Sequence, residues 1–185
     1  MIALSGFGYE EKLKDPSKAF TETWKSKSFI NGPAVKEFEK QFAQYCGTNH
    51  CVAVSSCTSA LHLSLLALGI GPGDEVITVP YTWVSTVEVI KQVGATPVFA
   101  DIRLNDMCID PKEVAKKINN KTKAIIGVDL YGNVCDIDEL KKFNVPVIQD
   151  SAQSTGAFYK SKRVGSVADL TCFSFYPTKN LSCWG

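Results

Sequence analysis

The sequence carries almost no net charge, few histidines and no paired cysteine motif. Its 20 Lys and Arg nearly balance 19 Asp and Glu, so no overall field would recruit nucleic acid or an anionic membrane surface. Only two histidines occur, and none of the seven cysteines forms a Cys-x-x-Cys pair, which argues against a metal site. We therefore expect a small molecule or another protein as the partner.

Segments that would direct the chain to or across a membrane are also missing. The opening "MIALSGFGYEEKLKD" lacks the basic start and unbroken apolar core of a secretory signal. Residues 47–73 are uncharged, but "TNH" and "SSCTS" interrupt them, so they are not a run of about 18 apolar residues that could cross a bilayer. The odd number of cysteines, placed in apolar runs, indicates buried, reduced thiols. These features predict a cytoplasmic protein without a membrane span.

No internal repeat or flexible linker divides the chain, whose 185 residues suit one domain with a sizeable core. Apolar periodicity predicts helices at residues 32–47, 58–68, 82–94, 111–118 and 136–143. Apolar runs predict strands at residues 51–56, 75–80, 96–101, 123–130, 145–150 and 170–175. Strands that alternate with helices in this way indicate an α/β fold with a mainly parallel sheet covered on both faces. We expect residues 1–30 to form a helical arm and loop, and residues 31–185 to form the α/β domain.

Polar side chains follow several of the predicted strands, where ligands bind in open parallel sheets. The segment "SSCTS" precedes an apolar helix, so its hydroxyls and the free N–H groups of the first turn can cradle a phosphate. Ser56 or Thr58 acting only as an N-cap fits this segment equally well. The glycine-rich "GIGPGDEV" follows a helix and opens a strand, which is the reverse of a dinucleotide-binding loop, so we interpret it as a turn.

Three further side chains occupy such strand ends. Asp150 ends a buried strand, where a carboxylate needs a cation or good donors, although it could also cap the next turn. Trp83 is either core or an aromatic that stacks on a flat ring. Lys179, in "SFYPTKN", is either an ordinary loop lysine or a reactive amine. A phosphate cradle, a carboxylate, an aromatic face and a lysine together match the needs of pyridoxal 5′-phosphate.

Six motifs, in order, resemble the large domain of the DegT-type nucleotide-sugar aminotransferases, which adopt fold type I of pyridoxal-phosphate enzymes. The motifs are "INGPAVKEFEKQFAQYCG", "VAVSSCTSALHLSLLALGIGPGDEVITVPYTWVST", "TPVFADI", "DLYGN", "QDSAQSTGA" and "FSFYPTKNL". The resemblance runs from about residue 15 to the last residue. It implies that the smaller C-terminal domain of the family is absent from this chain.

The resemblance assigns a role to each candidate residue. It implies that Lys179 is the Schiff-base lysine, which also moves the proton, and that Asp150 pairs with the pyridinium nitrogen of the cofactor. Gln153 is similar to the residue that contacts the ring hydroxyl, and Trp83 is similar to the aromatic that stacks on the ring. The implied phosphate anchors are Thr58, Ser59 and Ser174.

The implied activity moves an amino group from L-glutamate to the keto sugar of a nucleoside diphosphate, with pyridoxamine 5′-phosphate as the intermediate cofactor form. The family's shared sites imply a homodimer. Alternatives are another enzyme of the same cofactor fold, such as a desulfurase or an aldolase, and a catalytically silent fragment that only binds cofactor or sugar nucleotide. The related sugar dehydratases carry histidine in place of the lysine, so Lys179 argues against them.

Two residues depart from the family pattern. Cys57 stands where glycine often precedes the phosphate-binding threonine, and Asp129 stands where histidine commonly precedes "LYG". The first change bears on how closely the backbone approaches phosphate. The second bears on local hydrogen bonds and on substrate choice.

Overall fold

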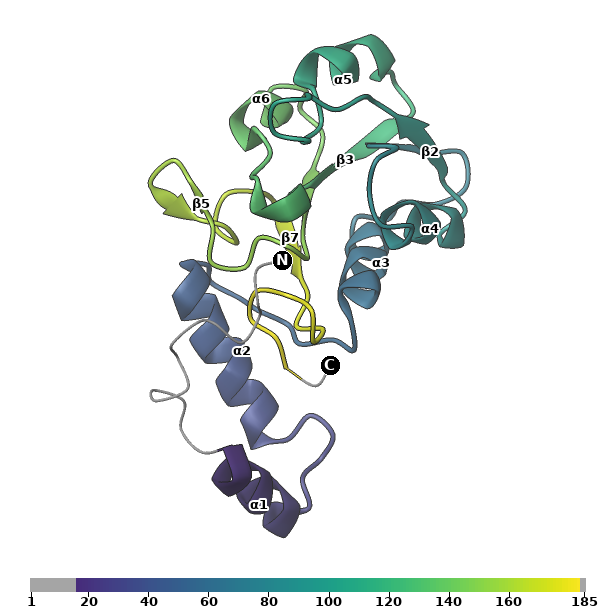
Figure 1. The fold of residues 1–185 in the computed structure, drawn as a ribbon. Helices are drawn as coiled ribbons and strands as arrows, with labels where there is room; N and C mark the ends of the chain where they lie inside the picture. The colour runs from purple at the N-terminus through teal and green to yellow at the C-terminus, as the bar shows by residue number, and fades with distance from the viewer. Residues whose placement is uncertain (1–15, 184–185) are drawn as a thin grey trace.

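The computed structural model describes residues 16–183, with helices around a central sheet (Figure 1). The α-helices are α1 (Pro16–Ser26), α2 (Pro33–Cys46), α3 (Cys57–Ala67), α4 (Ser85–Gln92), α5 (Pro111–Lys117) and α6 (Ile137–Lys141), with a short 3-10 turn η1 (Leu130–Gly132). The strands are β1 (Glu75–Thr78), β2 (Thr96–Phe99), β3 (Thr122–Val128), β4 (Val147–Ser151), β5 (Phe158–Tyr159), β6 (Lys162–Arg163) and β7 (Leu170–Phe173).

Five of the strands form one parallel sheet in the order β2-β1-β3-β4-β7. Successive side chains of a strand point to opposite faces, so each strand serves two hydrophobic layers. In β3, Ile125 faces the layer with α5 and α6, whereas Ala124 and Ile126 face the layer with α3 and α4. The predicted α/β class with a mainly parallel sheet between helices is confirmed.

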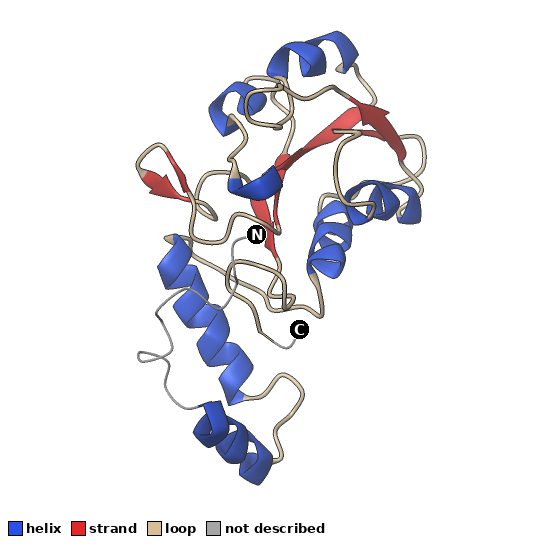
Figure 2. Cartoon of the chain, viewed as in Figure 1, coloured by secondary structure: helices blue, strands red, loops and turns tan. Residues whose placement is uncertain are grey.

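Each layer is closed by apolar side chains from its helices. Leu61 and Leu65 of α3 pack with Val89 and Ile90 of α4 against one face of the sheet. The other face is covered by α5 and α6 (Figure 2), through buried residues that include Val114, Ile137 and Leu140. Because both faces are buried, the strands contain continuous apolar runs, as the sequence predicted.

The helix α2 extends away from the sheet toward α1 (Figure 1). Pro33 lies at its start, and Gly47, with φ 75°, ends it in the left-handed conformation. Its predicted apolar face is confirmed where Phe42, which is buried, packs edge-on against Phe173 and Phe175. The division into an arm at residues 1–30 and a domain at 31–185 stays a prediction, and residues 1–15 lie outside the described part of the chain.

One predicted strand is wrong. Residues 51–54 are loop and pair with no strand in the described part of the chain, and they line a groove of about 710 Å³ together with β7. An apolar run forms a strand only where a neighbouring chain meets its N–H and C=O groups. The segment therefore remains loop, although its sequence suits a strand.

The remaining predicted elements are present, with ends that differ by a few residues. The glycine-rich segment at residues 69–74 is a turn between α3 and β1, as predicted. Within residues 16–183, no helix is long and apolar enough to cross a membrane. The same residues contain no cluster of three side chains suited to hold a metal ion.

Candidate active site

A cavity of about 410 Å³ opens where the carboxyl ends of the central strands meet the start of α3. It is lined by residues from the α3 start, the β1–α4 loop, the ends of β3 and β4, and the segment after β7. The lining residues are Ser56, Cys57, Thr58, Leu61, Thr82, Trp83, Ser85, Thr86, Val128, Asp129, Asp150, Ala152, Gln153, Ser174, Tyr176, Thr178 and Lys179. The cavity therefore gathers every predicted site residue except Ser59.

Asp150, near the end of β4, is 6% exposed and is held by neutral donors. Its Oδ2 accepts the Thr86 hydroxyl at 2.9 Å, and its Oδ1 accepts the Ala152 N–H at 3.2 Å. The Cys57 thiol lies 3.8 Å from Oδ1. Burial raises the pKa of Asp150, while these donors and the charge of Lys179 lower it. Within residues 16–183, no ion pair neutralises this carboxylate, so it is suited to meet a cationic ligand.

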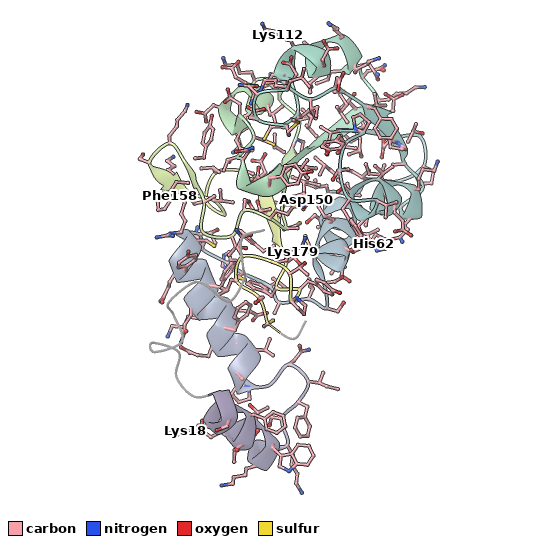
Figure 3. All side chains as sticks on the ribbon, viewed as in Figure 1. Lys18, His62, Lys112, Asp150, Phe158 and Lys179 are labelled. Atoms are coloured by element: carbon pink, nitrogen blue, oxygen red, sulfur yellow. The ribbon has the colours of Figure 1, made fainter. Side chains whose placement is uncertain are left out.

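Lys179 follows β7 on a segment that turns back across the cavity. Ser174, 8% exposed, accepts the N–H of Tyr176 at 3.3 Å, and the N–H of Lys179 donates to the Tyr176 carbonyl at 2.8 Å. These bonds hold the segment as a turn and direct the partly buried Lys179 side chain to the lining. Figure 3 shows Lys179 and Asp150 in the same central region of the molecule.

The start of α3 uses its hydroxyls in two ways. Ser56 is the N-cap, because its Oγ accepts the N–H of Ser59 at 3.1 Å. Thr58 lines the cavity and donates to Ser85 Oγ at 3.0 Å. Ser59 lies outside the lining, with its Oγ 2.9 Å from Ser55 Oγ and 3.1 Å from that of Ser56. Both interpretations of the segment are thus compatible with the structure: Ser56 caps the helix while Thr58 faces the cavity.

Trp83 and Gln153 flank the cavity from two different loops. Trp83 is 74% exposed, so it is not a core residue and leaves its ring free at the mouth. Gln153 lies just after β4, and its Oε1 accepts the N–H of Tyr131 at 2.7 Å. The Gln153 amide nitrogen has no hydrogen-bond partner within residues 16–183, so it can donate into the cavity.

Sequence reasoning missed Thr86 and the donor role of Cys57. Thr86 is completely buried and lies in α4, while Asp150 follows 64 residues later. Thr82 and Thr86 are four residues apart and 3.0 Å apart between hydroxyl oxygens, which is the one sequence signal for a polar pair on a helix face. Burial first, then Asp150, raises the pKa of the Cys57 thiol, so it stays protonated and donates.

The donor set fits pyridoxal 5′-phosphate. The buried Asp150 carboxylate has only neutral donors around it and suits a protonated ring nitrogen. Thr58 presents its hydroxyl at the start of α3, where N–H groups favour a phosphate, and Ser174 lines the same cavity from the segment after β7. Lys179 supplies an amine on the same cavity. The residues present therefore satisfy the cofactor's three needs: a ring partner, a phosphate anchor and a lysine.

Comparison with known proteins is consistent with this geometry. The chain is 46% identical over 173 residues to the spore coat polysaccharide biosynthesis protein SpsC of Bacillus subtilis, covering 91% of this chain and 44% of the relative. It is 39% identical over 181 residues to the dTDP-3-amino-3,4,6-trideoxy-alpha-D-glucose transaminase of Streptomyces venezuelae, covering 96% and 48%. The structure of NtdA from Bacillus subtilis with bound cofactor PMP superposes with a TM-score of 0.88 at 33% identity, covering 95% and 40%.

The chain thus spans about half the length of the curated relatives it matches. The sequence profile of the DegT/DnrJ/EryC1/StrS aminotransferase family matches residues 11–185. That match covers nearly the whole chain and includes every residue that lines the cavity. The chain belongs to the DegT/DnrJ/EryC1/StrS aminotransferase family.

Proposed function

We propose that this chain forms the pyridoxal-phosphate-binding part of a nucleotide-sugar aminotransferase. The observation that carries the proposal is the buried Asp150 carboxylate, which shares one cavity with Lys179 and forms no ion pair within residues 16–183. Holding a lone carboxylate in such a place costs several kcal/mol, on the order of the desolvation penalty for an ion, unless a ligand offsets it. A bound cofactor cation provides that compensation.

The cofactor, Asp150 and Lys179 each supply a different chemical function to the reaction. Bound pyridoxal 5′-phosphate supplies an electron sink for the carbon that carries the amino group. Asp150 keeps the ring nitrogen protonated, because a neighbouring carboxylate favours the charged form. Lys179 would hold the cofactor through Nζ, and its free amine would accept and return the proton as base and acid.

Binding and orientation come from the other lining residues. Thr58 and Ser174 anchor the phosphate from the α3 start and the segment after β7, with Ser59 in the same first helical turn. Trp83 would stack its free ring on the cofactor, and the Gln153 amide nitrogen would donate to the ring hydroxyl. These roles rest on the family resemblance and on the placement of the side chains around one cavity.

For the whole protein, we propose L-glutamate as the amino donor and the keto sugar of a nucleoside diphosphate as the acceptor. The relatives named as nucleotide-sugar transaminases support this substrate class, among them GDP-perosamine synthase of Caulobacter vibrioides. The alternative is a fragment that binds cofactor or sugar nucleotide without turnover. Loss of bound cofactor absorbance on addition of glutamate, followed by recovery with a keto-sugar nucleotide, distinguishes turnover from binding.

We also propose a homodimer in the cytoplasm. The exposed rings of Trp24 in α1 and Phe29 just after it favour a second subunit at this end of the molecule. Each of the seven cysteines is free, in accord with a reducing compartment. Light scattering coupled to gel filtration gives the assembly directly, and a monomer that retains cofactor binding would contradict the dimer.

The decisive experiment fixes the cofactor to the chain. The protein is incubated with pyridoxal 5′-phosphate, its visible spectrum is recorded, and borohydride reduction is followed by peptide mass mapping. We expect a yellow protein in which the Lys179 peptide gains the reduced cofactor, and a Lys179→Ala variant without that label.

Lys112→Ala is the matched control, because Lys112 is an exposed lysine on α5 far from the cavity (Figure 3). It should label as the unmodified protein does. Label spread over several surface lysines, or equal label in Lys179→Ala, would refute the assignment. A folded protein that takes no label at all would refute the cofactor proposal.

A further inference from the structure

The carboxylate of Asp129 is the most heavily hydrogen-bonded side chain around the cavity. Asp129 follows β3 and is 0% exposed. Its Oδ1 accepts the N–H of Cys135 at 3.0 Å. Its Oδ2 accepts three side-chain donors: Gln149 Nε2 at 2.8 Å, Ser151 Oγ at 3.0 Å and Ser154 Oγ at 2.7 Å. One carboxylate therefore ties β4 and the turn after it to the end of β3.

The turn held in this way carries Gln153. Ser151 and Ser154 are its ends, and the Ser154 N–H closes it by donating to the Ser151 carbonyl at 3.2 Å. Inside it, Gln153 Oε1 accepts the N–H of Tyr131, two residues beyond Asp129. Asp129, just after β3, therefore hydrogen-bonds both ends of the turn, and the N–H of Tyr131 hydrogen-bonds Gln153 in its middle. The orientation of the Gln153 side chain therefore depends on these hydrogen bonds.

The same carboxylate lies directly beside Asp150 along the backbone. The N–H of Asp129 donates to the Asp150 carbonyl at 3.0 Å and extends the pairing of β3 with β4. The two acidic residues nevertheless do different work. Asp150 offers its carboxylate to the cavity, whereas both oxygens of Asp129 are already used by protein donors.

In all four bonds the Asp129 carboxylate is the acceptor, and the backbone N–H of Cys135 can only donate. Gln149 turns its amide nitrogen toward Oδ2 although its own Oε1 is left without a partner. An asparagine at this position would present an NH₂ group to either the Cys135 N–H or the three donors at Oδ2. To keep their bonds, the Ser151 and Ser154 hydroxyls would have to accept from this NH₂ group, and Gln149 would have to present its oxygen in place of its nitrogen. The hydrogen bonds that hold the turn would therefore rearrange or be left unpaired.

We propose that Asp129 is a positioning residue for the cofactor site: it fixes the 151–154 turn so that Gln153 faces the cavity. The proposal rests on the proposed function, because the orientation of Gln153 matters there only if the cavity holds pyridoxal 5′-phosphate. Asp129 acts through the turn and does not touch the cofactor. It thereby explains why an aspartate can stand directly before "LYG" in this chain without removing a group that binds.

A double-mutant cycle tests the role in the full protein. The dissociation constant of pyridoxal 5′-phosphate is measured by absorbance titration for Asp129→Asn with Gln153 present and with Gln153→Ala. We expect Asp129→Asn to weaken binding about tenfold when Gln153 is present and less than about twofold in the Gln153→Ala background. A general loss of structure would weaken binding equally in both backgrounds, which would overturn the proposal.

Two further variants keep the test independent of folding defects. Ser154→Ala removes one donor to Asp129 while leaving the carboxylate, and should weaken binding in the same direction, again only when Gln153 is present. Asp138→Asn removes an exposed carboxylate on α6 and should bind cofactor as the unmodified protein does. If Asp129→Asn does not fold, Ser154→Ala alone carries the cycle, and unchanged binding in that variant would overturn the proposal.

Hydrogen exchange provides a measurement without cofactor. In the cofactor-free protein, the amides of residues 151–154 should exchange at least about threefold faster in Asp129→Asn than in Asp138→Asn. Unchanged exchange would refute the contact between Asp129 and the turn. An unmodified protein that binds no pyridoxal 5′-phosphate would overturn the proposed function, whereas unmodified binding with no Asp129→Asn effect would overturn the positioning role alone.

Discussion

Asp150 is a buried carboxylate whose nearest partners are a hydroxyl, a thiol and a backbone N–H. Thr86 makes the shortest of these contacts, and because its hydroxyl proton is used by Asp150, Thr82 must donate to Thr86. The pair of threonines thus forms a short chain of hydrogen bonds from the cavity rim to the carboxylate. Its effect is to orient Oδ2 while leaving the negative charge of Asp150 uncompensated.

Removing the Thr86 hydroxyl should therefore damage the site more than the fold. We expect Thr86→Val to lower the free energy of unfolding by about 1 kcal/mol and to weaken binding of pyridoxal 5′-phosphate about threefold to tenfold. Thr78→Val is the matched control, because Thr78 is a buried threonine on β1 whose hydroxyl donates to the Ile126 carbonyl. It should cost similar stability without weakening cofactor binding. Equal effects of both variants on binding would contradict the role of Thr86.

At the scale of single residues, the sequence predicted the site residues that stand in recognisable motifs. It missed contacts between residues that are far apart in the chain and meet only in the folded structure. Lys179 and Asp150 stand at strand ends, so their meeting at one edge followed from the parallel sheet. Thr86 contacts Asp150 across 64 residues of chain, and no local pattern specifies that contact. Asp129 was noticed as a departure, but its four donors come from segments whose relative placement depends on the register of β3 with β4.

Among the elements, α3 connects the sheet to the candidate phosphate site. Ser56, in extended conformation, caps the helix, while Leu61 and Leu65 bury its opposite face against the sheet. The helix is thereby fixed at both its start and its side. Its first N–H groups point to the region where Thr58 lines the cavity.

The cap at Ser56 can be tested by its effect on stability. Ser56→Ala removes the acceptor for the Ser59 N–H and should lower the free energy of unfolding by about 1 kcal/mol, measured by urea denaturation. Ser56→Gly should cost only a few tenths of that, because glycine adopts the cap backbone without strain and leaves the N–H groups open to water. A Ser56→Ala variant as stable as the unmodified protein would show that the Ser56 side chain does not stabilise the helix start.

The element that sequence reasoning mispredicted is equally informative. Residues 51–54 have the apolar composition of a strand, yet they form a loop that lines a groove of about 710 Å³. The composition of a segment indicates whether it suits a sheet. Whether it becomes a strand depends on a partner strand, which can lie anywhere in the chain. The helices α3 and α4 were predicted correctly because their apolar spacing is local to each of them.

For the molecule as a whole, two buried carboxylates make stability depend on pH. Burial outweighs the four donors and raises the pKa of Asp129 from 3.8 to about 6, and burial also raises the pKa of Asp150. A carboxyl whose pKa is raised by folding stabilises the folded state fully below its unfolded pKa, and that contribution is lost as the pH rises through the folded pKa. Both residues therefore act in the same direction.

We expect the free energy of unfolding of the cofactor-free protein to fall between about pH 4 and pH 6 relative to that of Asp129→Asn. The Asp129 contribution to this fall is about 3 kcal/mol, from a pKa difference of about two at 1.36 kcal/mol each. Urea denaturation at a series of pH values measures it. A difference between the two proteins that stays constant, or that grows in favour of the unmodified protein as pH rises, would contradict the titration of Asp129 in this range.

The unpaired edge of β7, beside the 710 Å³ groove, makes measured unfolding free energies depend on protein concentration. Within residues 16–183, β7 pairs only with β4, so its other edge presents N–H and C=O groups without a strand partner. An open strand edge is a template on which another extended chain can add, and identical molecules are the most abundant chains in a purified sample. Apparent unfolding free energies would then rise with protein concentration. Variants of this chain are therefore best compared at one dilute concentration, where self-recognition through β7 is weakest.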